Sequence, residues 1–189
     1  MRQLIVCTSL CAGLLPGAAM AQTTAPNAGV VAITKADIET VLKHVGTEGA
    51  GVDRQIKVVD LGKYNVAVGV LRRGASKEGA PVNAISHTHV TEVYYVISGG
   101  GTLVTGGTML NPQPLPASGE LVRIAVGTSF TGAFQGGDRM TVAAGDVVII
   151  PAGVPHGFTD VKEQVTYLSI RPDPEHVLPA GYVHPAIRK

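Results

Sequence analysis

The sequence predicts an all-β protein, a sandwich or a closed barrel, with one short helix before it. From Arg54 onward, short runs rich in Val, Ile, Thr and Tyr alternate with clusters of glycine, proline and asparagine. This pattern is typical of many short strands joined by turns. A helical spacing of apolar residues is found once, near the N-terminus. The predicted strands are 55–61, 64–72, 82–88, 92–98, 101–105, 121–126, 139–143, 146–151, 156–160 and 164–171.

The predicted helix covers residues 34–46. Thr34 is the expected N-cap, and Asp37 follows three residues later as its acidic partner. Apolar side chains then recur at the spacing of one helix face, and Gly46 is the expected stop. That face consists of Ile38, Val41, Leu42 and Val45.

Two segments rich in turn formers are predicted to be loops. Residues 106–119 contain three prolines, which exclude a central strand, and residues 127–138 are rich in glycine. Neither has the Gly-Lys-Ser/Thr of a phosphate-binding loop, so their glycines are interpreted as turn formers. The β domain is predicted to span 54–172, and the proline-rich tail 173–189 to run as an arm over its surface.

The N-terminal residues 1–21 are predicted to be a secretory signal peptide. They have a positive start, an apolar core too short to span a membrane, and Ala-Met-Ala before the expected cleavage after Ala21. Cleavage would place the protein in the periplasm or outside the cell. Both cysteines, Cys7 and Cys11, leave with the signal, so no disulfide is expected. Residues 22–33 are predicted to be a flexible lead-in.

Charge argues against two classes of partner. The chain has 15 basic and 14 acidic side chains, without runs of either sign. No basic stripe is present to neutralise phosphates or anionic lipids, so nucleic acid and membrane surfaces are not expected partners. A small neutral or weakly charged molecule fits better.

Three histidines and a glutamate suggest a metal site. In "ISHTHVTEVYYVISGG" (residues 85–100), His87 and His89 are two residues apart and share a face if they lie on one strand. In "GDVVIIPAGVPHGFTD" (residues 145–160), His156 follows a turn and begins the next strand. Pairing of neighbouring strands could bring His156 alongside the other two histidines. Imidazoles with a carboxylate suit Zn, Mn, Fe, Ni or Cu.

These two stretches resemble the two motifs of the cupin superfamily, over roughly residues 64–171. The second keeps the spacing Gly-x5-Pro-x-Gly-x2-His up to its histidine, with Asp160 where the family most often has asparagine. The first keeps the histidine pair and the six-residue gap from Glu92 to Gly99. The resemblance implies a double-stranded β-helix, the cupin jelly-roll barrel, with one divalent transition-metal ion inside. The implied metal ligands are His87, His89, Glu92 and His156.

One departure from the motif affects Glu92. Only Val90 and Thr91 separate His89 from Glu92, which is one residue fewer than the family's usual minimum. On an unbroken strand, this three-residue step would place Glu92 opposite the histidines. Convergence therefore requires a bend or bulge at Val90–Thr91, and a three-histidine site without Glu92 is the alternative.

Strand alternation nominates further site residues. If Glu92 faces inward, Tyr94 does too, and we expect it to orient a substrate or donate a proton as a catalytic residue. Tyr95 and Ile97 then face outward, where Tyr95 is a candidate for a homodimer surface. By the same parity Phe158 and Asp160 follow His156 inward as a second layer around the metal, with Asp160 hydrogen-bonded to a ligating imidazole.

The sequence supports two main hypotheses of function. The first is an exported single-domain cupin that binds a divalent metal ion and acts on a small organic molecule, with oxygenase, isomerase or decarboxylase chemistry and with residues 106–119 as a lid. The second is a non-catalytic binding module whose metal site is degenerate or absent. A structural barrel with a degenerate site is a third reading. His44, His176 and His184 are expected at the surface.

Overall fold

The computed structural model describes residues 29–43 and 52–188. The predicted signal peptide, most of the lead-in, His44 and the helix stop at Gly46 lie outside these ranges. Within the described part, no helix is long and apolar enough to cross a membrane. The elements are α1 (Lys35–Lys43), β1 (Val52–Asp60), β2 (Asn65–Gly74), β3 (Asn83–His87), β4 (Glu92–Thr105), β5 (Thr108–Pro114), the π-helix η1 (Leu121–Val126), β6 (Ser129–Gln135), β7 (Asp138–Ala143), β8 (Val147–Ile150), β9 (His156–Thr159), β10 (Gln164–Asp173) and the 3₁₀-helix η2 (Pro185–Ile187).

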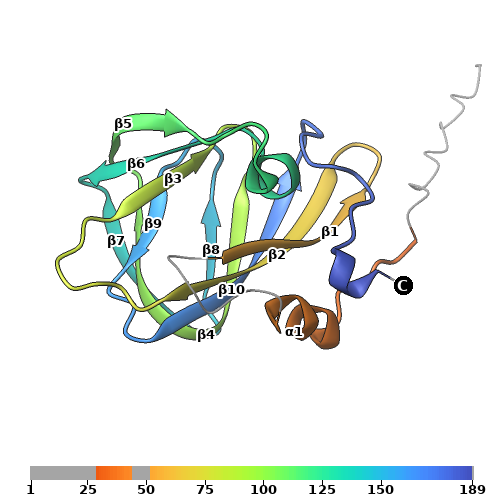
Figure 1. The fold of residues 1–189 in the computed structure, drawn as a ribbon, viewed down its shortest axis with the longest axis horizontal. Coiled ribbons are helices and arrows are strands. Elements are labelled where there is room, and N and C mark those ends of the chain that lie inside the picture. Colours follow the sequence, from red (N-terminus) through yellow and green to blue (C-terminus); the bar gives the residue numbers. More distant parts are fainter. Residues whose placement is uncertain (1–28, 44–51, 189) are drawn as a thin grey trace, which may run out of the picture.

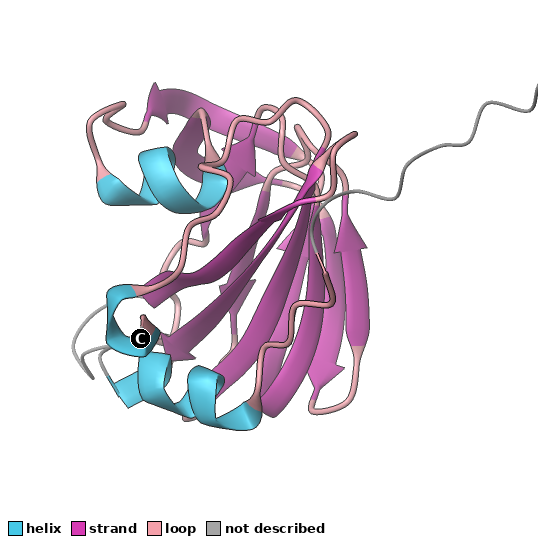
Figure 2. Cartoon of the chain, turned by 90° about the vertical axis from the view of Figure 1, so that its right-hand side faces the viewer, coloured by secondary structure: helices cyan, strands magenta, loops and turns pink. Residues whose placement is uncertain are grey.

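The strands form a curled, wholly antiparallel sheet in the order β1-β2-β10-β4-β9-β3-β6-β5, with β7 and β8 also paired to β4 (Figure 1). One half of the barrel contains β1, β2, β10 and β8, and the other contains β3, β5, β6, β7 and β9. Figure 2 shows that the helical segments lie outside the curled sheet, on one side of it. The predicted all-β jelly-roll barrel with one short helix is confirmed.

Strand β4 belongs to both halves of the barrel. Its first residues pair with β10 and β8, and from Gly100 onward it pairs with β7 and β9. The two predicted strands 92–98 and 101–105 are therefore one strand that bends at its glycines. Gly99 has a φ of 71°, and a Cβ there would lie 1.9 Å from the carbonyl oxygen of Gln164. Only glycine fits this crossing point.

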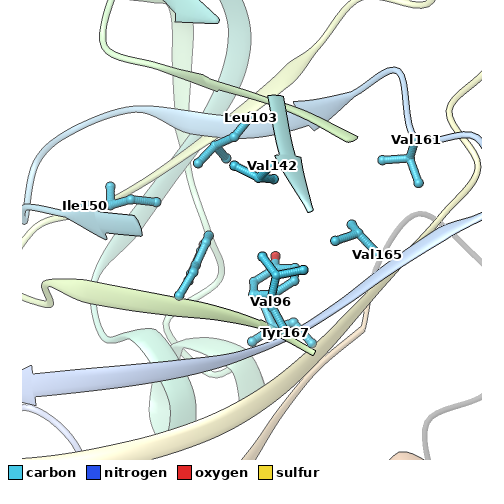
Figure 3. Close-up of a cluster of buried hydrophobic side chains, with 9 residues drawn as sticks. Val96, Leu103, Val142, Ile150, Val161, Val165 and Tyr167 are labelled. Atoms are coloured by element: carbon cyan, nitrogen blue, oxygen red, sulfur yellow. The ribbon is translucent and has the colours of Figure 1, made fainter. Parts of the chain in front are cut away.

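The interior of the barrel contains an apolar cluster. Val96, Leu103 and Tyr167 belong to a cluster of nine buried side chains contributed by both halves (Figure 3). Along β4, Tyr94 and Val96 are buried while Tyr95 and Ile97 are 44% and 39% exposed, as the alternation predicts.

Helix α1 covers the outer face of β1 and β2. Val41 is fully buried against Ile56 and Val70. The predicted cap forms: the Asp37 carboxylate accepts from the Thr34 amide at 3.0 Å, and the Thr34 hydroxyl accepts from the Asp37 amide at 3.1 Å. Aspartate therefore replaces the usual glutamate of the capping box.

Three sequence predictions about local structure are wrong. Residues 108–114 form β5 within the expected loop, because an edge strand tolerates proline where a central strand does not. Residues 129–135 form β6 within the second expected loop, with the turns confined to its flanking glycines. Residues 121–126 form a π-helix instead of a strand, because this short apolar run packs against β1 rather than extending a sheet.

The tail folds back onto the barrel. Val183 forms a β-bridge with Lys57, and the Asp173 carboxylate accepts hydrogen bonds from the amides of Val177 and Leu178 at 3.0 and 2.9 Å. Leu178 is buried beside Val90. The tail is thus packed along β1, and among the described residues its only helix is the 3₁₀-helix η2.

Candidate metal centre

Three buried side chains meet inside the barrel, each at a strand terminus. His87 ends β3, Glu92 begins β4 and His156 begins β9. The Nε2 atoms of His87 and His156 lie 3.2 and 3.1 Å from Oε2 of Glu92, and one nitrogen or oxygen atom from each residue lies within 4.8 Å of the others. We call this set the His–Glu–His cluster.

A corner between two strands explains how Glu92 joins the cluster. Strand β3 ends at His87, the chain bends at Thr88 and His89, and β4 starts at Glu92. Because this corner interrupts the strand, the side toward which Glu92 points does not depend on the side toward which His87 points. The bend expected at Val90–Thr91 occurs just before these residues, and the buried Val90 anchors the corner in the core.

His89 does not join the cluster. Its Nδ1 lies 2.6 Å from Oε2 of Glu175, and its side chain is 34% exposed. The expectation that His87 and His89 share a face fails because that rule holds only within a strand, and β3 ends between them. This placement also removes the alternative of a three-histidine site.

Hydrogen bonds fix the tautomers of both cluster histidines. Nδ1 of His156 lies 3.0 Å from the carbonyl oxygen of Val154, which can only accept, so Nδ1 carries the proton of the neutral ring. Nδ1 of His87 lies 2.8 Å from Oγ of Ser129. Ser129 Oγ donates its own proton to the carbonyl of Gly127 at 2.9 Å, so it accepts from His87. In its neutral form, each ring would carry its proton on Nδ1 and present an unprotonated Nε2 to Glu92.

The carboxylate of Glu92 is almost saturated. Oε1 accepts from Ser169 Oγ at 2.7 Å and from Arg171 Nε at 2.9 Å, and Oε2 accepts from the Tyr94 hydroxyl at 2.7 Å. A carboxylate has about four lone-pair sites, so about one remains, on Oε2. That lone pair faces the two imidazole nitrogens.

The cluster fits a divalent transition-metal ion. Three unshared lone pairs converge in a buried site, and His156 Nε2 has no hydrogen-bond partner among the described residues. Two ligand atoms that each lie about 2.1 Å from one ion, with an angle of about 90–109° at the ion, are about 3.0–3.4 Å apart. The distances from Glu92 Oε2 to both nitrogens fall in this range. Two imidazoles and one carboxylate also form a common donor set for such ions.

Arg171 holds Glu92 from behind. This fully buried side chain of β10 donates from Nε to Glu92, from Nη1 to Oε1 of Gln55 at 2.8 Å, and from Nη2 to Oδ2 of Asp53. Gly69 leaves the space for it, because a Cβ there would lie 2.8 Å from Nη1. Sequence reasoning missed Arg171, although its charge at an inward position of a strand is a usable signal.

Buried charges shift the pKa values of the cluster. Burial raises the pKa of Glu92, whereas Arg171 lowers it, and this pKa is held well below its usual range. Burial lowers the pKa of His87, although Glu92 acts in the opposite direction. At neutral pH the cluster is therefore a carboxylate with a neutral His87, the protonation states that metal binding requires.

These shifts predict acid sensitivity of the metal-free protein. Below about pH 6.5, the ordinary pKa of histidine, the unfolded chain takes up a proton at His87 that the folded chain resists, so the free energy of unfolding should fall. Glu92 adds a further loss below its ordinary pKa of 4.5. Urea titrations between pH 8 and 4 in the presence of EDTA measure this. A free energy of unfolding that stays constant down to pH 4.5 would contradict the assigned states.

The other predicted site residues have different fates. Tyr94 is buried at the cluster, and Phe158 is half-buried, with its ring centroid 6.5 Å from that of Tyr94 and 5.3 Å from that of Tyr167. Asp160 does not follow His156 inward. Strand β9 ends at Thr159, Asp160 has a φ of 53°, and its exposed carboxylate pairs with Arg139 at 2.9 Å. The partners of the two imidazoles are Ser129 and the Val154 carbonyl instead.

A cavity of about 980 Å³ opens onto the cluster. Aromatic rings of Tyr94, Phe158 and Tyr167 form part of its wall, and η1 contributes Leu121 and Ile124. No residue of 106–119 lines it, so the predicted lid is not supported, and η1 covers the cavity instead. Its volume suits a small organic molecule.

Comparisons with known proteins give distant similarities. No family model and no curated protein matches the chain. The chain is similar to the solved structure of BH2720 from Bacillus halodurans, with 16% identity and a TM-score of 0.47 over 85% of this chain and 93% of that one. It is also similar to the DMSP lyase DddQ from Ruegeria pomeroyi DSS-3, with 12% identity and a TM-score of 0.42 over 74% of this chain and 54% of that one.

A third similar structure is a recombinant oxalate oxidase in complex with glycolate, with 17% identity and a TM-score of 0.42 over 69% of this chain and 54% of that one. The chain therefore spans about half the length of DddQ and of the oxalate oxidase. Because these identities and TM-scores are low, the function proposed below depends on the side chains of this protein.

Proposed function

We propose that this protein is a metal-dependent enzyme of the cupin type that acts on a small organic molecule in its barrel. The observation that supports this best is the convergence of three unshared lone pairs, from His87, Glu92 and His156, beside a cavity large enough for such a molecule. The ion would be Zn, Mn, Fe, Ni or Cu, and when bound it supplies Lewis-acid or oxygen-binding chemistry.

The chain's own residues then have distinct tasks. His87, Glu92 and His156 would hold the ion with three protein ligands, which would leave positions open for a molecule in the cavity. Tyr94 lines the cavity and its hydroxyl lies 2.7 Å from Glu92, so it is placed to orient a substrate at the cluster through its proton. Burial and the neighbouring Glu92 raise the pKa of Tyr94 well above its usual value, which keeps the hydroxyl protonated.

Two features of the proposal concern the whole molecule. The predicted signal peptide, with cleavage after Ala21, places the activity in the periplasm or outside the cell. The outer face of β4 and β8 exposes Tyr95, Ile97, Val147 and Ile149, and this apolar face supports the proposed homodimer.

A binding module without turnover is the second candidate. It is favoured by the absence of His89 from the cluster, which leaves one ligand fewer than the motif resemblance implied. The enzyme predicts that metal stabilises the protein, whereas the binding module, whose metal site is degenerate or absent, does not require it. They differ in whether a bound molecule is changed.

Metal removal and a turnover assay test the two candidates together. At an ion concentration of about 100 times its Kd, the free energy of unfolding should rise by about 2.7 kcal/mol over the EDTA-treated protein. The loaded protein is then incubated with a panel of small organic molecules and the products are analysed by mass spectrometry, with Tyr94→Phe as the parallel variant. Product that depends on metal and decreases with Tyr94→Phe supports the enzyme. Ligands that stabilise the protein but are recovered unchanged support the binding module, and no stabilisation by any of the five ions contradicts the metal-dependent enzyme.

A further inference from the structure

The wall of the cavity carries cationic side chains as well as carboxylates. Arg54, Arg73 and Lys77 line it, against the carboxylates of Asp53, Glu92 and Glu120. Arg171 lies directly behind two of these carboxylates and bonds to both. Arg171 does not line the cavity, but its charge compensates Glu92 and Asp53 from behind the wall. Arg54, Arg73 and Lys77 are the cations that an anion in the cavity would meet.

Arg73 is placed where an anion could also reach the cluster. It is half-buried on β2, and its Nε donates to the Tyr167 hydroxyl at 3.3 Å. The Tyr167 ring contacts the Tyr94 ring, with centroids 4.4 Å apart, and the Tyr94 hydroxyl bonds to Glu92. The tilted pair of Tyr167 and Tyr94 rings thus lies between Arg73 and the His–Glu–His cluster.

The chemistry of this group points to a carboxylate. A guanidinium is planar and binds a carboxylate through two parallel N–H donors. The bond to Tyr167 restricts the side chain in advance, which reduces the entropy lost on binding. Tyr167 also raises the pKa of Arg73 further, despite burial, so its charge is permanent. The aromatic and aliphatic wall beside it, with Leu71, Phe158 and Val161, suits a carbon skeleton.

We propose that Arg73 and Tyr167 form a carboxylate-binding subsite and that the substrate is a small organic acid. Its carboxylate binds Arg73, and another part of the molecule reaches the His–Glu–His cluster. Only this second contact rests on the proposed function. The subsite itself requires no metal.

Arg72 provides a matched control for Arg73. It is the next residue on the same strand but faces away from the cavity, with its Nε 3.4 Å from Oγ1 of Thr166. Arg73→Gln and Arg72→Gln therefore remove the same charge from opposite faces of β2. Calorimetric titration of the metal-loaded full-length protein with acetate, propionate and benzoate, and with benzamide and inorganic phosphate for comparison, measures the effect.

In the wild type and in Arg72→Gln, at least one carboxylate should bind more tightly than benzamide and phosphate. Arg73→Gln should weaken carboxylate binding by about 10- to 100-fold, because charged hydrogen bonds are lost, and should change benzamide binding little. Tyr167→Phe, which keeps the ring, should weaken carboxylate binding less, by about 3- to 10-fold. This variant provides the test if Arg73→Gln does not fold.

Equal carboxylate binding by both arginine variants, or no carboxylate preferred over benzamide, would show that the subsite does not exist. Tighter binding of phosphate would overturn the assignment to carboxylates. Metal content is measured on the same samples, so failure of the subsite can be distinguished from failure of the proposed function. The wild type could hold no metal and still bind carboxylates, with that binding lost in Arg73→Gln. This result would support the subsite without the metal enzyme.

Discussion

Replacing His156 with alanine is expected to abolish binding of the metal ion. The variant loses one of three ligands, and the lost Nε2 is a buried atom without a hydrogen-bond partner among the described residues. The wild type should retain one ion per chain after dialysis, and His156→Ala should retain almost none. Elemental analysis of protein purified without chelators measures this. The deleted ring also leaves a cavity, so folding is checked by circular dichroism.

His89→Ala is the control that separates the structure from the motif. The motif resemblance makes His89 a ligand, whereas the structure pairs it with Glu175 outside the cluster. We expect His89→Ala to bind metal as the wild type does, with a change in stability below about 1 kcal/mol because its ion pair is largely exposed. Loss of metal in His89→Ala would contradict the arrangement described here and restore the four-ligand site.

Replacing Arg171 with methionine should produce the largest loss of stability. Arg171 is fully buried and compensates the charges of Glu92 and Asp53. Removing one partner of a buried ion pair typically costs about 3–5 kcal/mol, because the remaining charge is left uncompensated. Urea denaturation of the EDTA-treated protein, followed by circular dichroism, measures the change. A divalent ion should restore part of this loss, because it supplies positive charge at Glu92.

Arg72→Met is the matched control, since Arg72 makes one hydrogen bond at the outer face of the same sheet. It should cost about 1 kcal/mol or less. If Arg171→Met does not fold, Gly69→Ala gives a milder test, because its Cβ would crowd Nη1 of Arg171, and overpacking typically costs about 1–3 kcal/mol. Equal stability of the Arg171 and Arg72 variants would show that the buried ion network contributes nothing.

The sequence predicts the fold well because its two signals are local. Alternating apolar residues mark the inner face of each strand, and glycine and proline mark the turns, so β2, β3 and β10 were predicted within a few residues. The errors occur where a local signal is ambiguous. The run Leu121–Val126 has the composition of a strand but forms a π-helix, and only its packing against β1 distinguishes the two.

The candidate site was predicted less completely, because its geometry depends on where strands end. Parity correctly places Tyr94 on the inner face, since β4 is continuous from Glu92. Parity fails for His89 and for Asp160, because each lies just beyond the end of its strand. Arg171 bonds to Glu92 across 79 residues of sequence, and no local pattern could reveal that pairing.

The packing of Leu178 against Val90 has a consequence for the end of the chain. Chain ends usually tolerate deletion, because few buried contacts hold them. Here Leu178 fills the space behind the corner that separates His87 from Glu92. Shortened versions of the protein that stop before Leu178 would keep all three ligands and yet lack the support that sets two of them at the correct spacing.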